Sequence, residues 1–249
     1  MMTPDVPPPA LVIFDLGGTT IRDRGGVPAA FAAALDASGL TAHPSEFTAW
    51  RGASKREVLA RLVTAQRPSM CITERAALSA WVYQHFVGVL ADRLRAIEDL
   101  ALPDARPAFE RLQGAGIRVA LNSGFDRTLL DVILKAVNWP AHLIDVVVCS
   151  DDVPEGRPAP LMIFRSMEAV GVADVSRVAV VGDTCLDLEA GANAGVAYRI
   201  GVLTGAHDRA TLERAPYTHI LASVGLVPDL WLGGAARPAI ERAAPGSMI

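Results

Sequence analysis

The chain has 249 residues, a formal net charge of −4 and 51% hydrophobic residues, so it can bury a sizeable core and does not resemble a disordered chain. The acidic balance and the absence of basic runs argue against a nucleic-acid partner or an anionic membrane surface. No apolar run is long enough to cross a bilayer, and Cys71, Cys149 and Cys185 lack the spacing of a zinc site or a disulfide framework. We therefore expect a soluble, cytoplasmic protein.

The first predicted strand covers residues 10–15 and ends in a carboxylate. Its apolar run reaches Asp15 and is followed by Gly17, Gly18 and two threonines. Such runs are typical of buried strands in parallel sheets, whose carboxyl ends carry the binding sites. By itself the pattern allows three interpretations. Asp15 is a nucleophile or metal ligand in phosphoryl chemistry, the turn is a phosphate loop of the sugar-kinase type, or Asp15 only caps a strand-to-helix turn.

Residues 25–102 show only helical patterns. Helices are predicted over residues 29–37, 45–52, 58–63 and 78–90. The last of these has the i, i+3, i+4, i+7 spacing of an amphipathic helix, and its apolar stripe includes His85, which we expect to be packed in the core. Because no strand pattern interrupts this block, it predicts an inserted helical domain.

Strands alternate with helices of about ten residues after residue 103. The predicted strands cover residues 117–121, 143–149, 178–181, 197–202 and 218–221, and the predicted helices cover residues 107–114, 128–137, 160–170, 186–194 and 210–215. This alternation predicts right-handed βαβ units and a parallel α/β sheet. The expected division is a discontinuous core of residues 1–24 and 103–249 and a helical domain of residues 25–102, with a mobile tail from Gly233.

Each strand end carries a group suited to phosphoryl chemistry. In strand order these groups are Asp15, Ser123 with Gly124, Arg157, and Asp183 with Asp187. Carboxylates from separate strands make an oxygen site that suits Mg²⁺. Ser123 and the Gly124 amide could donate to a phosphoryl oxygen, and Arg157 offers a permanent charge. This set is sufficient for phosphoryl transfer, which depends mainly on positioning and charge neutralisation.

The four segments that carry these groups resemble the four ordered motifs of the haloacid dehalogenase superfamily. They are residues Phe14–Thr20, Leu121–Gly124, Gly156–Pro160 and Gly182–Asp187. The resemblance implies a Rossmann-like core with a type-one helical cap, an aspartyl-phosphate on Asp15, and Mg²⁺ held by Asp15, Asp183, Asp187 and the Gly17 carbonyl. The sugar-kinase interpretation would need further ATP-binding motifs, which we do not find in the sequence.

One position departs from most phosphatases of this superfamily. They carry a second Asp two residues after the nucleophile, where this chain has Gly17. Glycine cannot transfer a proton, and a general acid is typically worth about 10²–10⁴-fold in rate. Lys55 follows a glycine turn in the helical insertion, and a lysine iminium would supply the electron sink that C–P bond cleavage needs.

The segment around Lys55, the Asp15 motif and residues Asp151–Pro158 are similar to the phosphonatase-like (phosphonoacetaldehyde hydrolase) branch of the superfamily. The resemblance implies a Schiff base on Lys55, a homodimer formed through the caps, and a small phosphonate substrate. The implied catalytic residues are Asp15, Lys55, Arg157 and Ser123, and the implied substrate contacts are Gly17, Gly124, Gly52, Arg51 and Phe125.

The chain also departs from that branch, with Gly17 in place of Ala, Val58 in place of a His and Phe125 in place of a Tyr. Two alternatives therefore stay open. One is a phosphatase that hydrolyses a small phosphate monoester without the second Asp. The other is a non-catalytic protein that binds a phosphorylated ligand.

Overall fold

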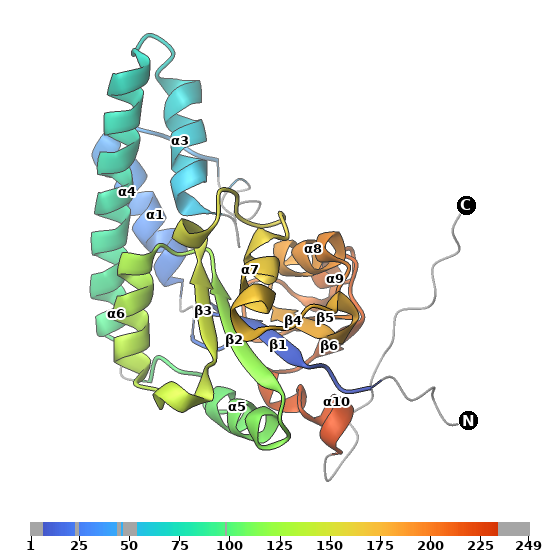
Figure 1. Cartoon of the computed structure of the whole chain (residues 1–249). Helices are drawn as coiled ribbons and strands as arrows, with labels where there is room; N and C mark the ends of the chain where they lie inside the picture. The colour runs from blue at the N-terminus through green and yellow to red at the C-terminus, as the bar shows by residue number, and fades with distance from the viewer. Residues whose placement is uncertain (1–6, 23–24, 44–45, 47–53, 98, 234–249) are drawn as a thin grey trace.

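The computed structural model describes residues 7–22, 25–43, 46, 54–97 and 99–233. Its centre is a parallel sheet of six strands in the order β3-β2-β1-β4-β5-β6 (Figure 1). The strands are β1 (Leu11–Asp15), β2 (Arg118–Ser123), β3 (Val146–Cys149), β4 (Val178–Gly182), β5 (Tyr198–Val202) and β6 (His219–Leu221). The strand order reverses at β1, which pairs with both β2 and β4, and ligand sites of open α/β sheets lie at such points. The predicted Rossmann-like sheet is confirmed.

The side chains of β1 alternate between two apolar layers. Val12 and Phe14 belong to a large cluster that includes residues of α5 (Ala105–Gly114) and α6 (Arg127–Val137). Leu11 and Ile13 belong to a smaller cluster with residues of α7 (Leu161–Val170) and α8 (Cys185–Ala194). Two short helices, α9 (Arg209–Leu212) and α10 (Asp229–Leu232), follow β5 and β6. The full burial of β1 between these layers fixes Asp15 at the edge of the sheet.

The helical insertion contains α1 (Gly26–Ser38), α3 (Lys55–Gln66) and α4 (Ile72–Arg95). Helix α4 packs against α1 and α3, and its other neighbour is α6 beside the sheet (Figure 1). The apolar side chains of these helices continue into the cluster that contains Val12 and Phe14. The division into core and cap domains therefore stays a prediction. The helix predicted over residues 45–52 and the tail beyond Gly233 lie outside the described residues, apart from Glu46.

The chain enters and leaves this insertion at adjacent points. Ile21 and Ala101 form an antiparallel bridge. On either side of it the Arg22 N–H donates to the Leu100 carbonyl at 2.8 Å, and the Leu102 N–H donates to the Thr20 carbonyl at 2.9 Å. The two crossings thus form a short two-stranded ribbon directly after the Asp15 loop.

The structure corrects three details of the sequence prediction. His85 is exposed and stacks on the ring of Trp81 at 5.7 Å, because α4 buries the neighbouring stripe of Val82, Phe86 and Leu90. Strand β3 starts later than predicted because residues 141–143 form a 3₁₀ turn. Helix α9 ends before the predicted residue 215. Among the described residues, no helix combines the length and apolarity needed to span a bilayer.

Candidate active site

Asp15 and Arg157 form the centre of the site. Asp15 is the last residue of β1 and is 8% exposed, and Arg157, in the loop that precedes α7, is 9% exposed. The Nη1 atom of Arg157 donates to Oδ1 of Asp15 at 2.7 Å, and its Nη2 donates to the Asn122 carbonyl at 3.0 Å. The guanidinium therefore ties the end of β1 to the end of β2.

Asp183 approaches the same point from the end of β4. Its Oδ1 accepts from the Thr19 hydroxyl at 3.1 Å, and its Oδ2 accepts from the Ala206 N–H at 2.6 Å. The side chain fits only because two glycines stand against it. A Cβ on Gly18 would lie 2.5 Å from Oδ2 of Asp183, and a Cβ on Gly205 would lie 2.0 Å from the same atom.

Asp187, in the first turn of α8, is fully buried and faces two groups. Its Oδ2 accepts from the Thr184 N–H at 3.1 Å and the Thr184 hydroxyl at 2.6 Å. Its Oδ1 lies 3.0 Å from Nε of Arg157 but accepts no hydrogen bond, so this contact is an ion pair without aligned donor geometry. The carboxylate thus holds the opposite edge of the guanidinium from Asp15.

The second strand end contributes Ser123 and Phe125. Ser123 is 1% exposed, and its hydroxyl oxygen accepts from the Phe125 N–H at 3.1 Å. The preceding Asn122 accepts from the Ser166 hydroxyl at 2.7 Å through its side chain. The Phe125 ring lies close to the loop after β1. A Cβ built on Gly17 would be 3.8 Å from the Cζ atom of this ring. The structure therefore brings Asp15, Gly17, Ser123, Phe125 and Arg157 together.

Burial and mutual repulsion govern the charges of the site. Burial raises the pKa of Asp15 to about 7, with a further rise from the Asp187 charge, although Arg157 acts in the opposite direction. Burial also raises the pKa of Asp183, and repulsion from Asp15 and Asp187 adds to the effect. One guanidinium does not neutralise three buried carboxylates, so the site favours an additional cation.

The donor set fits Mg²⁺, although within the described residues no group of three or more acidic, His or Cys side chains is arranged to hold a metal. Mg²⁺ commonly takes one or two carboxylates together with water and phosphate oxygens. Asp15 and Asp183 can supply those carboxylates. The loop after β1 bonds through Leu16, Gly18 and Ile21, so these hydrogen bonds do not use the Gly17 carbonyl.

Lys55 is the first residue of α3, where Ser54 caps the helix by accepting from the Glu57 N–H at 3.4 Å. The same turn contacts the Arg157 loop. Oε1 of Glu57 accepts from the Gly156 N–H at 3.3 Å, and a Cβ on Gly156 would lie 3.4 Å from the Cβ of Ser54. Lys55 therefore stands in a turn that touches the residue before Arg157. Arg51 and Gly52 lie outside the described residues.

A second contact between the insertion and the core includes Tyr83 and Asp126, which the sequence analysis did not single out. Arg56 lies over the Tyr83 ring at 4.6 Å, and its Nη2 lies 3.5 Å from Asp126 and 3.8 Å from Asp151. Burial raises the pKa of Tyr83, and the charge of Asp126 adds to the rise. Asp126 caps the N-terminus of α6. This N-cap position, directly after Phe125, is the one feature of the sequence that could have pointed to Asp126.

Comparison with known proteins agrees with this geometry. The chain matches the family described as haloacid dehalogenase-like hydrolase over residues 9–195. It therefore belongs to the haloacid dehalogenase-like hydrolases, a family of enzymes. The four segments at the strand ends are the part of the sequence that predicted this membership.

Among its relatives are enzymes named phosphonoacetaldehyde hydrolase. The one from Bacteroides fragilis is 28% identical over 223 residues, which cover 86% of this chain and 83% of that protein. The one from Latilactobacillus sakei is 31% identical over 193 residues, covering 74% and 72%. A solved structure of a phosphonoacetaldehyde hydrolase like protein from Oleispira antarctica superposes with a TM-score of 0.75 at 21% identity, covering 94% of this chain and 97% of that one, which supports the fold.

Proposed function

We propose that the protein is a Mg²⁺-dependent hydrolase that cleaves the C–P bond of a small aldehyde phosphonate, phosphonoacetaldehyde or an analogue. The observation that carries the proposal is Gly17, which leaves the position of the general acid without a side chain beside Asp15. A carbon leaving group gains nothing from an oxygen acid, whereas it needs an electron sink. The relatives named phosphonoacetaldehyde hydrolase support the same substrate class.

Asp15 is the phosphoryl acceptor in this proposal. Arg157 engages its Oδ1, so we assign Oδ2 to the attack on phosphorus. Ser123 and the Gly124 amide bind phosphoryl oxygens, and Arg157 neutralises the charge that develops on them. Because Oδ1 of Asp187 lies 3.0 Å from Nε of Arg157, we assign Asp187 to hold Arg157 in place; this oxygen accepts no hydrogen bond, so the role of Asp187 as a Mg²⁺ ligand stays a prediction.

Mg²⁺ would be held by Asp15, Asp183 and the Gly17 carbonyl, and when bound it supplies the positive charge that the buried carboxylates lack. Thr19 and the Ala206 N–H hold Asp183 in its position toward Asp15. These two contacts fix the carboxylate on both of its oxygens, so its orientation is set before a cation or substrate enters.

Lys55 supplies the electron sink. Its amine condenses with the substrate carbonyl to form an iminium and releases water. Asp15 then bonds to phosphorus while the C–P electron pair moves into the iminium, which becomes an enamine. The enamine takes up a proton and is hydrolysed to the aldehyde, which frees Lys55, and water converts the aspartyl-phosphate into Asp15 and phosphate. The contact between Glu57 and Gly156 keeps the Lys55 turn next to the Arg157 loop.

Reductive trapping tests the imine directly, because Lys55 and Lys135 are the only two lysines in the sequence. Borohydride with phosphonoacetaldehyde should inactivate the enzyme and place the adduct on Lys55, as mapped by mass spectrometry. Lys135, exposed in the last turn of α6, and the terminal amine serve as internal controls. Normal turnover without an adduct on Lys55 would contradict the mechanism.

The phosphatase alternative rests on a different observation, the contacts that hold Asp15 against Arg157 and Asp183 against Thr19. The two functions separate in Lys55→Ala, which should abolish C–P cleavage and leave hydrolysis of a phosphate monoester largely intact. We also propose a homodimer through the insertion, where Trp81 on α4 is 49% exposed.

A further inference from the structure

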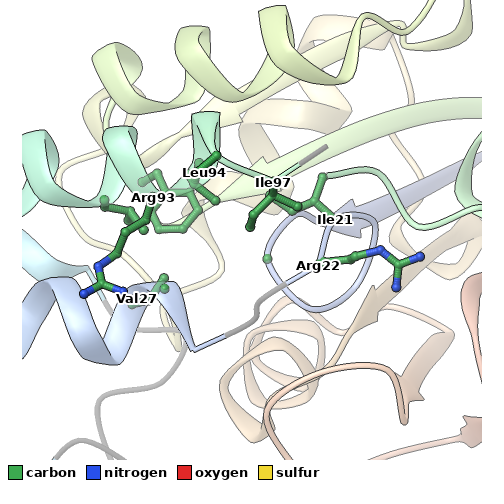
Figure 2. Close-up of a pocket in the computed structure, with 11 residues that line it drawn as sticks. Ile21, Arg22, Val27, Arg93, Leu94 and Ile97 are labelled. Atoms are coloured by element: carbon green, nitrogen blue, oxygen red, sulfur yellow. The ribbon is translucent and has the colours of Figure 1, made fainter. Parts of the chain in front are cut away.

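A cavity of about 260 Å³ lies beside the candidate active site. It is bounded by the loop after β1, the start of α1 and the last turns of α4, and Figure 2 shows the residues around it. Gly17 and Phe125 belong to its lining, so the cavity opens at the residue that stands two positions after Asp15.

Gly17, two residues after Asp15 in the chain, gives the cavity lining no side chain on this side. A Cβ at this position points toward the Phe125 ring at 3.8 Å, and both residues line the cavity. An acidic side chain here would extend into this space. The glycine at the position of the general acid therefore leaves this side of the cavity open.

The lining is apolar over most of its extent and basic at its ends. Its apolar residues are Ile21, Val27, Leu90, Leu94, Ala96, Ile97 and Phe125. Figure 2 shows the guanidinium groups of Arg93 and Arg22 at opposite ends of the surface formed by Ile21, Leu94 and Ile97. The Nε of Arg22 donates to the Asp99 carbonyl at 2.9 Å. Within the described residues, the Arg93 guanidinium makes no hydrogen bond or ion pair, so it can receive an anion.

We propose that the substrate is an analogue of phosphonoacetaldehyde whose organic part carries, besides the aldehyde that reacts with Lys55, an apolar chain with an anionic end, and that this chain binds in the cavity with its anionic end on Arg93. The inference rests on the proposed function in placing the reacting phosphono group at Asp15 and the aldehyde at Lys55. At about 30 Å³ per water-sized group, the volume holds roughly eight or nine non-hydrogen atoms. The aldehyde part of phosphonoacetaldehyde, with two carbons and one oxygen, would fill only a part of it.

Calorimetric titration with unreactive alkylphosphonates in the presence of Mg²⁺ tests the proposal without depending on catalysis. The probes are ethylphosphonate, hexylphosphonate and 5-carboxypentylphosphonate. We expect hexylphosphonate to bind more tightly than ethylphosphonate, and 5-carboxypentylphosphonate to bind at least tenfold more tightly than ethylphosphonate. Equal affinities for ethylphosphonate and 5-carboxypentylphosphonate would overturn the proposal.

Two variants, Arg93→Gln and Val27→Phe, separate the contribution of the Arg93 charge to binding from that of the apolar lining of the cavity. Arg93→Gln should weaken the binding of 5-carboxypentylphosphonate to the level of hexylphosphonate and leave ethylphosphonate unchanged. Arg95→Gln is the matched control in the same helical turn, since Arg95 pairs with Asp92 and does not line the cavity, and it should change none of the affinities. Val27→Phe should weaken both long probes only. An equal effect of Arg93→Gln and Arg95→Gln would refute the role of Arg93.

Phosphate release is measured separately with phosphonoacetaldehyde and with small phosphate monoesters. If the long probes bind tightly and no C–P cleavage occurs, the proposed function fails while the cavity assignment stands. If phosphonoacetaldehyde is cleaved and the three probes bind equally, the cavity assignment fails while the proposed function stands.

Discussion

Arg157 is the only guanidinium that an ion pair joins to the buried carboxylates of Asp15 and Asp187 in the described part of the chain. Its three contacts use different nitrogen atoms, which a lysine ammonium could not reach together. Burial raises the pKa of Asp15 and of Asp183, and repulsion between the carboxylates adds to the rise. These contacts and charges support the proposal that the site binds a cation together with an anionic phosphoryl group.

The adjacent glycines of the first loop should differ in their sensitivity to substitution by alanine. Gly18→Ala forces a Cβ to within 2.5 Å of Asp183 Oδ2 at a φ of +82°, so we expect a loss of about 1–3 kcal/mol of stability and weaker Mg²⁺ binding. Gly17→Ala places its Cβ at an ordinary contact distance from Phe125 and should leave both nearly unchanged. Urea unfolding and Mg²⁺ titration of both variants check this, and equal effects of the two substitutions would be inconsistent with the geometry.

Among the elements, β2 and the segment that leads into β3 are held together by one carboxylate. Asp145 accepts from the Val119 N–H at 2.8 Å, from Gln113 at 3.2 Å and from Arg118 at 2.7 Å. Burial alone would raise the pKa of Asp145, but these hydrogen bonds outweigh it and hold the pKa below the usual value. The ionised form therefore stabilises the folded state.

Asp145→Ala should reveal this contribution as a pH-dependent loss of stability. Because the pKa is lower in the folded state, the stabilisation is complete above the unfolded pKa of about 3.9 and disappears as pH falls through the folded value. We expect a loss of about 1–2 kcal/mol at pH 7 that shrinks below about pH 4. Urea unfolding at several pH values measures it, with the exposed Asp131→Ala as control. A loss that is constant with pH would show that the carboxylate charge plays no part.

Element packing also explains how far the sequence could predict the fold. The burial of β1 and the alternation after residue 103 were visible as apolar runs, so the parallel sheet and the strand-end positions of Asp15, Ser123 and Asp183 followed directly. The exposure of His85 did not follow, because a one-residue rotation of α4 moves it from the buried stripe to the surface. The contact of Arg56 with Asp126 joins residues 70 positions apart, and no local pattern marks it.

For the molecule as a whole, the exposed Trp81 on the insertion leads to a prediction about assembly. Contiguous exposed apolar patches commonly mark contacts between proteins, and Trp81 is an exposed aromatic ring that the described part of the insertion offers to such a patch. If the homodimer forms through the insertion, Trp81→Ser should shift the protein toward the monomer in size-exclusion chromatography with light scattering. Phe164→Ser removes a comparably exposed aromatic ring from α7, outside the insertion, and should leave the dimer intact. A wild-type monomer, or equal dissociation by both variants, would rule out this interface.

The ribbon formed by residues 20–22 and 100–102 has a mechanical consequence. Both crossings between the insertion and the sheet are bonded to each other, and the Ile21 carbonyl also accepts from the Gly18 N–H at 2.8 Å. The two covalent crossings thus form a single stem, so any tilt of the insertion would bend this stem as well as disturb the contacts of α4 with α6 and of Glu57 with Gly156. Since the stem continues into the turn between Asp15 and Ile21, we expect such a tilt to displace this turn, which carries the proposed phosphoryl acceptor Asp15.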